Sequence, residues 1–487
     1  MKTSLKLAAA SLVILGSSLL YAEENTSKAE KITLTIDQAV EYALKNSKSL
    51  KSSAIDLEIA KRANTFSWNV LLPSASVSGT LARSNSIDYV KSQMTSTAVL
   101  MGMAQGMPAA QAMANSSSIT DSILDAAYSS EEAVLWHPVG SLSFQWNFNA
   151  AMIESMVIAK KQYEAGKISW DKSCNETELS IRQLFYGILM MRESLRIDEE
   201  SLANSEARMK QAEINYRNGQ VPELSLLNAR VTYQNKKPSV EWARQNMEQQ
   251  MDMFAFLLGL PYGQEIELVG SIDQDYAELR GKLSALDADS LFLAYVEQNA
   301  EIQNLKKQIE VLKSGIAAST LSIFTPSLSV GWGLNPTVSN IEKNWLDKDN
   351  YNETGNLTIT LVYSNLFDML PFSSGMQKIK DSKQNLAKLE IGLDQLYQNT
   401  EMTIHNSVAD INKSIDNINS MNRNIEVAQA AYNSTLRGYN NGSQEELAVK
   451  DAENSLSQAK LGLTNEKFTF ITTVLKLENQ LNTKLTK

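Results

Sequence analysis

Apolar residues recur at alternating steps of four and three between Ser374 and Asn440. The stripe consists of Ile404, Val408, Ile411, Ile415, Ile418 and Ile425, and Asn422 takes the place of one apolar residue. This heptad spacing predicts a helix that packs against another helix along a narrow seam. No proline interrupts the stretch, so at about 1.5 Å per residue a helix of about 100 Å is expected. A helix of this length needs partner helices of similar length.

The rest of the chain supplies such partners. Residues 150–217 form a second predicted helix of the same length, and Pro222 with Glu223 opens a helix that reaches Leu258. Pro238 lies inside this third helix and is expected to kink or interrupt it, because proline lacks the N–H of a helical hydrogen bond. The final helix carries apolar residues at steps of seven, namely Leu456, Leu463, Phe470 and Leu477.

A further helix is predicted near the start of the chain. Thr35 and Asp37 offer capping oxygens for it, and it is expected to end near Leu72, where Pro73 follows.

Four short segments show the alternation of a β-strand with two different faces: 74–82, 139–148, 327–335 and 355–363. One face carries large apolar residues, and the other carries mostly Ser, Thr, Gly, Asn and Gln. Each segment has close to the 9 to 11 residues, roughly, that a tilted strand needs to cross a bilayer. Small polar side chains suit a water-filled lumen, and four tryptophans lie where an aromatic belt would place them: Trp136, Trp146, Trp332 and Trp345. A small soluble sheet with one wet face is the alternative interpretation.

The order of elements occurs twice. The sequence Tyr216-Arg217-Asn218-Gly219 recurs as Tyr439-Asn440-Asn441-Gly442, and Pro73 recurs as Pro326 after another strand-preceding helix. This repetition divides the chain into a first repeat (23–258), a connector (259–287) and a second repeat (288–487). Because four strands cannot close a barrel and open edges are costly in lipid, the strands predict an oligomer that shares one barrel.

The loop between the two strands of the first repeat is much longer than its counterpart. It is rich in Ala, Ser and Met, with methionines at Met94, Met101, Met103, Met107 and Met113. Thioethers can bind soft metal ions. We favour a flexible extracellular loop or short helix, because methionine also packs well in irregular apolar gaps.

Composition narrows the function classes. The formal charge of -10 disfavours a nucleic-acid partner. Residues 1–22 have two lysines before an apolar run and a small residue at Ala22, which predicts a secretory signal peptide. The single cysteine, Cys174, cannot form an intramolecular disulfide. With only two histidines and no nucleophile elbow or phosphate loop, no enzyme, metal or cofactor is expected.

These features together resemble the TolC family of outer-membrane efflux proteins. The likeness runs from Asp37 to about Leu481, and its strongest local matches are Tyr216-x-x-Gly219 with Leu226-x-x-Ala229, and Tyr439-x-x-Gly442 with Leu447-x-x-x-Asp451-Ala452. The resemblance implies a mainly α-helical protomer with a membrane β-barrel portion. Three copies would form a homotrimer whose twelve strands make one barrel in outer-membrane lipid, continued by a coiled-coil tunnel. The location implied is the outer membrane of a Gram-negative-type cell, with most of the mass in the periplasm.

The function implied by the resemblance is a passive export conduit of a tripartite efflux or type I secretion system. Its partners would be a periplasmic adaptor (membrane fusion) protein and an inner-membrane pump or secretion transporter. The substrate class stays open among drugs, metal ions and proteins, because a wide water-lined duct selects little. A periplasmic coiled-coil scaffold or tether without a pore is the alternative.

The resemblance also implies a gate at the helix–helix turns, where the family closes its tunnel with acidic and hydrogen-bonded side chains. Asp451 matches one acidic position of that gate, Ala448 stands at a second, and Glu445 is the nearby acid that could compensate. Tyr216 and Tyr439 either hydrogen-bond across helices or pack at the helix ends.

The turns themselves contain Gly219, Pro222, Gly442 and Ser443. The glycines are expected to supply left-handed backbone. The sequence Ser443-x-x-Glu446 predicts a capping box at the start of the last helix.

Overall fold

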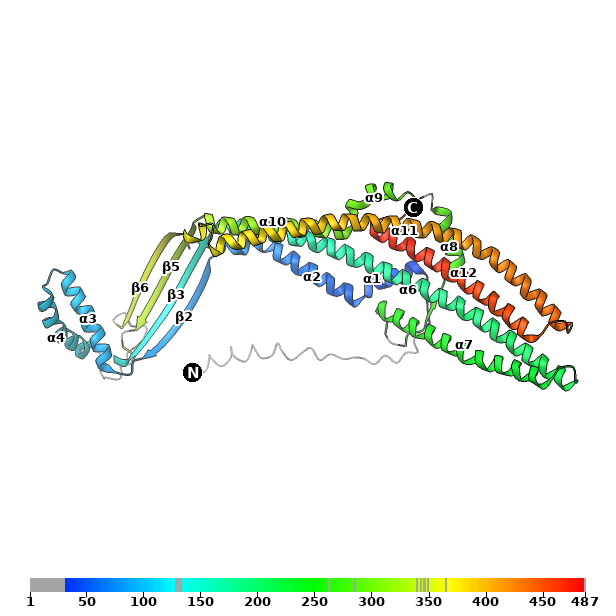
Figure 1. The fold of residues 1–487 in the computed structure, drawn as a ribbon. Helices are drawn as coiled ribbons and strands as arrows, with labels where there is room; N and C mark the ends of the chain where they lie inside the picture. The colour runs from blue at the N-terminus through cyan, green and yellow to red at the C-terminus, as the bar shows by residue number, and fades with distance from the viewer. Residues whose placement is uncertain are drawn as a thin grey trace. The chain divides into compact units, whose positions relative to one another are not determined.

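The computed structural model describes residues 31–127, 134–261, 263–283, 286–338, 340–341, 344, 347, 350–363 and 366–485. The predicted signal peptide and Trp345 lie outside these residues. The chain divides into two compact units, and each contains segments of both repeats. We call Met1–Ile55, Ile168–Gln303 and Leu396–Lys487 the helical unit, and Asp56–Lys167 with Asn304–Gln395 the sheet unit. Figure 1 shows the elements in chain order.

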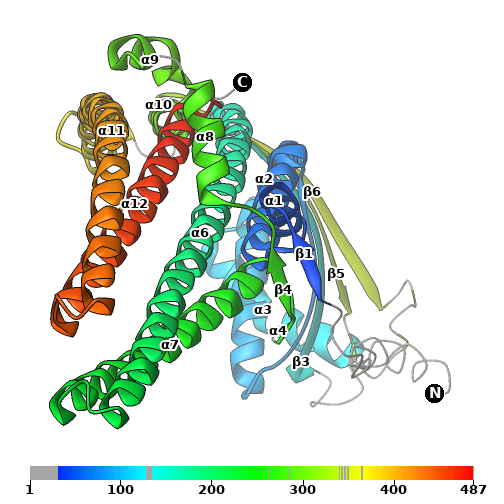
Figure 2. The ribbon, with the colours of Figure 1, turned by 90° about the vertical axis from the view of Figure 1, so that its right-hand side faces the viewer.

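Two helices of 67 residues, α6 (Ala151–Arg217) and α11 (Ser374–Asn440), confirm the two long helices predicted from the sequence. Each contributes residues to both units. In the helical unit, α7 (Glu223–Leu257) turns back along α6, and α12 (Glu446–Leu481) turns back along α11 (Figures 1 and 2). The plan of two helical hairpins follows directly from the two Asn-Gly turns.

Two helix predictions are wrong in detail. The helix expected to reach Leu72 is divided into α1 (Ile36–Asn46), α2 (Lys48–Thr65) and the 3-10 helix η1 (Ser67–Leu71), because Ser47 leaves the helical conformation with ψ 126°. The predicted interruption at Pro238 does not occur, because α7 continues through it, whereas a kink at this position stays a prediction. The proline ring removes one N–H only, and both Pro238 and Gln234, four residues earlier, are exposed, so water can reach the carbonyl that loses its partner.

The core of the helical unit lies where its long helices meet. Phe185 of α6, Phe254 of α7 and Phe470 of α12 are all fully buried there. The predicted seam of α11 is confirmed by the burial of Ile404, Val408, Ile411 and Ile418 in the same core. Burying one apolar side chain of this size contributes about 1.5–3 kcal/mol to the stability of the folded state.

Short elements of the connector join this core. Strand β4 (Ile266–Leu268) pairs in parallel with β1 (Ile32–Leu34), a pairing that the sequence did not reveal. The helices α8 (Ile272–Lys282) and α9 (Ala288–Tyr295) follow, with the 3-10 helix η2 (Val296–Gln298).

The sheet unit contains one antiparallel sheet in the order β2-β3-β5-β6. Its strands span Ser74–Arg83, Trp136–Phe148, Ser327–Val338 and Tyr351–Val362. The register places Phe144 opposite Trp332, and Trp332 opposite Leu357. Residues opposite one another share a face, so the predicted apolar face is confirmed. The other face carries small polar pairs such as Ser76 and Ser143, whose hydroxyl oxygens are 2.7 Å apart.

The apolar face of the sheet is open to solvent in a single chain. Val77 is 81% exposed, Ile359 is 68% exposed and Leu361 is 66% exposed. Among the described residues, β2 and β6 each pair on one side only, which leaves two free strand edges. Large exposed apolar surface beside free edges is typical of surfaces that bind another protein or a membrane.

None of the described helices combines the length and the apolarity needed to cross a bilayer.

The long loop of the first repeat is a helical hairpin, α3 (Ile87–Ala104) and α4 (Ala109–Ala127). At its base Met94 packs with Val90 and Val134. The second repeat enters the sheet through α10 (Ala300–Phe324) and leaves it through the 3-10 helix η3 (Leu366–Met369).

Candidate functional site

The two turns that join the long helices have the same backbone geometry. Gly219 has φ +71° and Gly442 has φ +75°, the left-handed conformation predicted for both. In each turn the residue after the glycine donates its N–H to a carbonyl five residues back, from Gln220 to Asn215 and from Ser443 to Gly438, both at 2.8 Å. These are the 6→1 bonds of a Schellman motif. The structure thus reproduces the repeat at the level of single hydrogen bonds.

The predicted capping box of α12 is wrong. The N-cap residue is Glu445, with no side-chain capping bond. The Ser443 hydroxyl instead donates to the Gly438 carbonyl at 3.0 Å, at the end of α11. The Schellman turn brings Ser443 back over the end of α11. Its hydroxyl therefore caps the C-terminus of α11 and is not available to cap the N-terminus of α12.

The predicted gate residues occupy different environments. Glu445, the N-cap residue of α12, and Asp451, in its second turn, are exposed, and in the described part of the chain neither side chain has a hydrogen bond or ion pair. Tyr216 is 40% exposed at the end of α6. Tyr439 packs against the cluster of Tyr432, Val449 and Leu456, which joins the ends of α11 and α12. The structure therefore brings only Tyr439 of this group into a packed contact.

A buried ion cluster lies farther along the same helices. The Arg208 guanidinium of α6 donates to the Glu453 carboxylate of α12 at 2.5 Å, and their side chains are 8% and 3% exposed. The Lys236 ammonium of α7 donates to the same carboxylate oxygen at 3.1 Å and also to the Ser201 hydroxyl. Three helices are joined through one carboxylate. Taking these charges out of water is costly unless they stay paired.

Half-buried acid and phenol groups surround this cluster. Burial raises the pKa of the Tyr432 phenol, and the Glu453 carboxylate raises it further. Burial likewise raises the pKa of Tyr439, with a second contribution from Glu446. The Oε2 atom of Glu446 is buried without a hydrogen-bond partner. The site contains charges and hydrogen-bonding groups that fix helices to one another.

Glu446 gives this site a pH-dependent stability. Burial raises the pKa of its carboxyl, against the opposing effects of Arg208 and Lys450. The folded state then holds the proton more tightly than the unfolded state, so this contribution favours folding at low pH and is lost as pH rises through the folded-state pKa. We expect Glu446→Gln to stabilise the helical unit at about pH 8 and to have a smaller effect at about pH 4. Denaturant unfolding followed by circular dichroism measures the difference.

Glu445→Gln is the matched control, because Glu445 is the neighbouring, exposed carboxylate. It should change stability little at either pH. An equal loss of stability at both pH values in Glu446→Gln would contradict the assignment.

Sequence reasoning missed the ion cluster entirely. Arg208 and Glu453 are 245 residues apart, and nothing in the local sequence distinguishes them from exposed charges. One signal was available in retrospect. Arg208 lies eight residues before Tyr216 of the first turn motif, and Glu453 lies two residues after Asp451 of the second.

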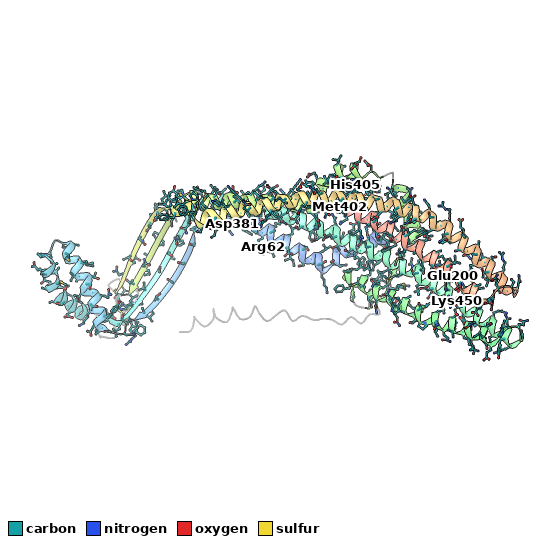
Figure 3. The ribbon with its side chains drawn as sticks, in the orientation of Figure 1. Arg62, Glu200, Asp381, Met402, His405 and Lys450 are labelled. Carbon is teal, nitrogen blue, oxygen red and sulfur yellow. The ribbon has the colours of Figure 1, made fainter. Side chains whose placement is uncertain are left out.

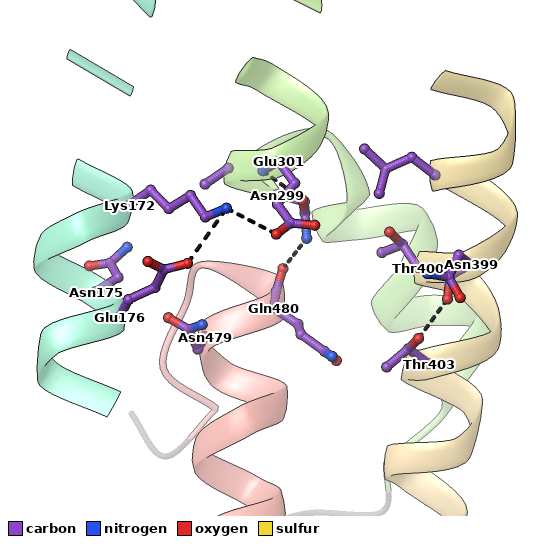
Figure 4. A pocket seen from close by; sticks show the side chains of 12 residues that line it. Lys172, Asn175, Glu176, Asn299, Glu301, Asn399, Thr400, Thr403, Asn479 and Gln480 are labelled. Atoms are coloured by element: carbon purple, nitrogen blue, oxygen red, sulfur yellow. Dashed lines mark hydrogen bonds and ion pairs between the residues drawn. The ribbon is translucent and has the colours of Figure 1, made fainter. Parts of the chain in front are cut away.

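A second polar region of the helical unit is a cavity of about 270 Å³ (Figure 4). The Lys172 ammonium there lies 3.0 Å from Glu301 and 3.5 Å from Glu176. Asn299 donates to the backbone carbonyl of Gln480 at 3.0 Å. These bonds tie α6 and the end of α12 to the start of α10, and we assign the cavity a structural role.

No family model matches the chain. Outer membrane protein TolC of Salmonella enteritidis is 26% identical over 119 residues, and that of Escherichia coli (strain K12) is 25% identical over 119 residues. The match spans 24% of this chain and 24% of each of these curated relatives.

The structural likeness covers almost the whole chain. The structure of CusC has a TM-score of 0.67 at 14% identity, covering 92% of this chain and 91% of CusC. The outer-membrane channel OprN gives 0.66 at 14% identity, with 93% and 91% covered. The CmeC outer membrane channel of Campylobacter jejuni gives 0.67 at 12% identity, with 92% and 85% covered. The fold is that of outer-membrane channel proteins, and the resemblance to the TolC family seen in the sequence is confirmed.

Proposed function

We propose that this protein is the outer-membrane channel of an export system. In this proposal three copies assemble through their sheets into a shared barrel, and their long helices form a periplasmic tunnel. The channel conducts passively, and an inner-membrane pump or secretion transporter supplies the energy through a periplasmic adaptor. The fold that the chain shares with CusC, OprN and CmeC supports this function.

The observation that carries the proposal is the four-stranded sheet. Its two outer strands, β2 and β6, each pair on one side among the described residues, and one face is apolar and exposed. In hydrocarbon each unpaired backbone group costs several kcal/mol, so such edges must pair with other strands. Pairing of β2 with β6 of a neighbouring copy would satisfy both edges. The apolar face would then contact lipid and the small polar face a water-filled lumen.

Conductance tests this proposal directly. The purified protein, added to a planar lipid bilayer, should produce stepwise ion conductance and should require detergent for its extraction from membranes. A protein that washes off membranes in buffer and gives no conductance would favour the scaffold without a pore.

We further propose that the helix ends of the helical unit regulate the channel. The cluster of Arg208, Lys236 and Glu453 would hold α12 against α6 and α7 in the closed state. The tyrosines and the exposed acids Asp451 and Glu445 would lie nearer the aperture, on the turns. Opening would then require the buried ion pairs to separate or to move together.

Asp451 tests the acidic part of this gate. Three copies of Asp451 around an axis would attract cations, and close carboxylates resist simultaneous ionisation. We expect Asp451→Ala to raise single-channel conductance or to weaken block by multivalent cations in planar bilayers. Asp416 is an exposed acidic residue of α11 that lies away from the turns, so Asp416→Ala is the control substitution. Identical conductance and block in all three proteins would remove Asp451 from the gate.

A further inference from the structure

The tip of the α3–α4 hairpin carries methionines that packing does not explain. Methionine is one of the residues most often buried. Four at this tip are instead 63%, 46%, 41% and 66% exposed: Met101, Met103, Met107 and Met113, respectively. The fifth methionine of the hairpin, Met94, packs at its base.

The two helices touch at Gly102 and Ala112. A Cβ atom placed on Gly102 would lie 3.2 Å from the Ala112 Cβ and 3.6 Å from the Met107 Sδ. Ala112 is only 3% exposed, so the contact is closed. The Met107 sulfur therefore lies beside the point where α3 and α4 cross.

Helix geometry determines on which flank of this crossing Met101, Met103 and Met113 lie. Successive residues of a helix are turned by about 100°, so Met101 and Met103 lie on opposite flanks of Gly102. Because α4 returns antiparallel to α3 after the short turn 105–108, Met113 lies on the same flank as Met103. Met103 and Met113 thus share one flank of the crossing, Met101 lies on the other, and the Met107 sulfur lies beside the crossing itself.

We propose that Met103, Met107 and Met113 bind a soft monovalent cation, Cu(I) or Ag(I), through their three sulfur atoms. The unbranched methionine side chain has three rotatable bonds, so sulfurs on neighbouring turns can converge on one ion. Thioethers are soft ligands that select Cu(I) over harder divalent ions. They are also uncharged, and an ion of single charge loses less hydration free energy at a neutral site than a divalent ion does.

The ligand set excludes the common alternatives. Within the described residues, no group of three His, Cys, Asp or Glu side chains is placed to hold a metal ion. The carboxylate of Asp121 lies nearer the base of the hairpin and is paired with Lys91 at 3.1 Å. Zn(II), which prefers nitrogen, thiolate and carboxylate ligands, should therefore not compete for this site.

Titration of the full-length protein with Ag(I) tests the proposal. The protein carries Cys174→Ser, which removes the one thiol, and it is purified in detergent without a histidine tag. We expect one Ag(I) per chain by calorimetry in chloride-free buffer. The triple variant Met103→Leu/Met107→Leu/Met113→Leu should bind at least about tenfold more weakly, a loss of about 1.4 kcal/mol. Leucine keeps the volume of methionine, so the hairpin should fold.

Met101→Leu is the matched control, because it removes an equally exposed methionine from the opposite flank. It should leave the affinity unchanged. X-ray absorption of the Cu(I)-loaded protein should show sulfur ligands only. Equal Ag(I) binding by the parent and the triple variant, equal weakening by Met101→Leu, or nitrogen and oxygen ligands in the absorption spectrum would each overturn the proposal. None of these measurements depends on the channel function.

Discussion

Glu453→Ala is expected to destabilise the helical unit by about 3 kcal/mol, because it leaves two cations without their buried partner. Arg208 is 8% exposed and stays buried, whereas Lys236 is 21% exposed and can partly turn to solvent. This places the loss toward the lower end of the range for a broken buried pair. The same variant should raise the open probability of the channel, because α12 loses its link to α6 and α7. Denaturant unfolding and single-channel recording measure the two effects.

Lys460→Ala is the matched control for this variant. Lys460 of α12 lies 3.3 Å from Glu200 of α6, so it joins the same two helices, but their side chains are 24% and 45% exposed; Glu200 is labelled in Figure 3. Exposed pairs contribute at most about 1 kcal/mol. If Glu453→Ala changed stability and gating no more than Lys460→Ala does, the cluster would not hold the helices together.

A triple replacement tests whether the loss of stability in Glu453→Ala comes from the unpaired buried charges. Arg208→Met, Lys236→Met and Glu453→Leu together remove the charges and keep apolar volume. Such replacements of buried ion clusters are often neutral or stabilising. We therefore expect stability near that of the parent protein.

Ile359→Arg is expected to abolish membrane assembly. Ile359 lies on the apolar face of β6, directly opposite Val330 of β5. An arginine on the lipid face of a barrel costs about 2–4 kcal/mol near the middle of the bilayer, and three copies would carry three such charges. Membrane fractionation and native electrophoresis of the detergent extract measure the loss of assembled protein.

Thr358→Arg is the control on the neighbouring position. Thr358 lies opposite Gly331 on the small polar face, which the proposal assigns to the water-filled lumen. It should assemble normally and reduce cation conductance. Equal assembly of both variants would argue that neither face contacts lipid.

The sequence predicted the long elements well because their signals extend over many residues. The heptad stripe of α11 and the alternation of the four strands each repeat one pattern several times, so single exceptions such as Asn422 do not hide them. The left-handed glycines at 219 and 442 were predictable for another reason, because few residues besides glycine tolerate that backbone.

Features that depend on tertiary contacts were not predictable. The capping box predicted at Ser443 does not form, because the Ser443 hydroxyl donates to the Gly438 carbonyl at the end of α11. The parallel pairing of β1 with β4 involves strands of three residues, too short to show a period. Arg208 pairs with Glu453 because α6 and α12 pack together in one particular register. A single sequence does not show which helices pack together or in which register.

The mass of the detergent-solubilised particle tests the central claim most directly. Native mass spectrometry of the protein extracted from membranes should give three copies of the chain. In the proposed barrel of twelve strands, the free edge of β2 in each copy pairs with the free edge of β6 in the next. A stable, single chain that stays monodisperse in buffer without detergent would contradict the account.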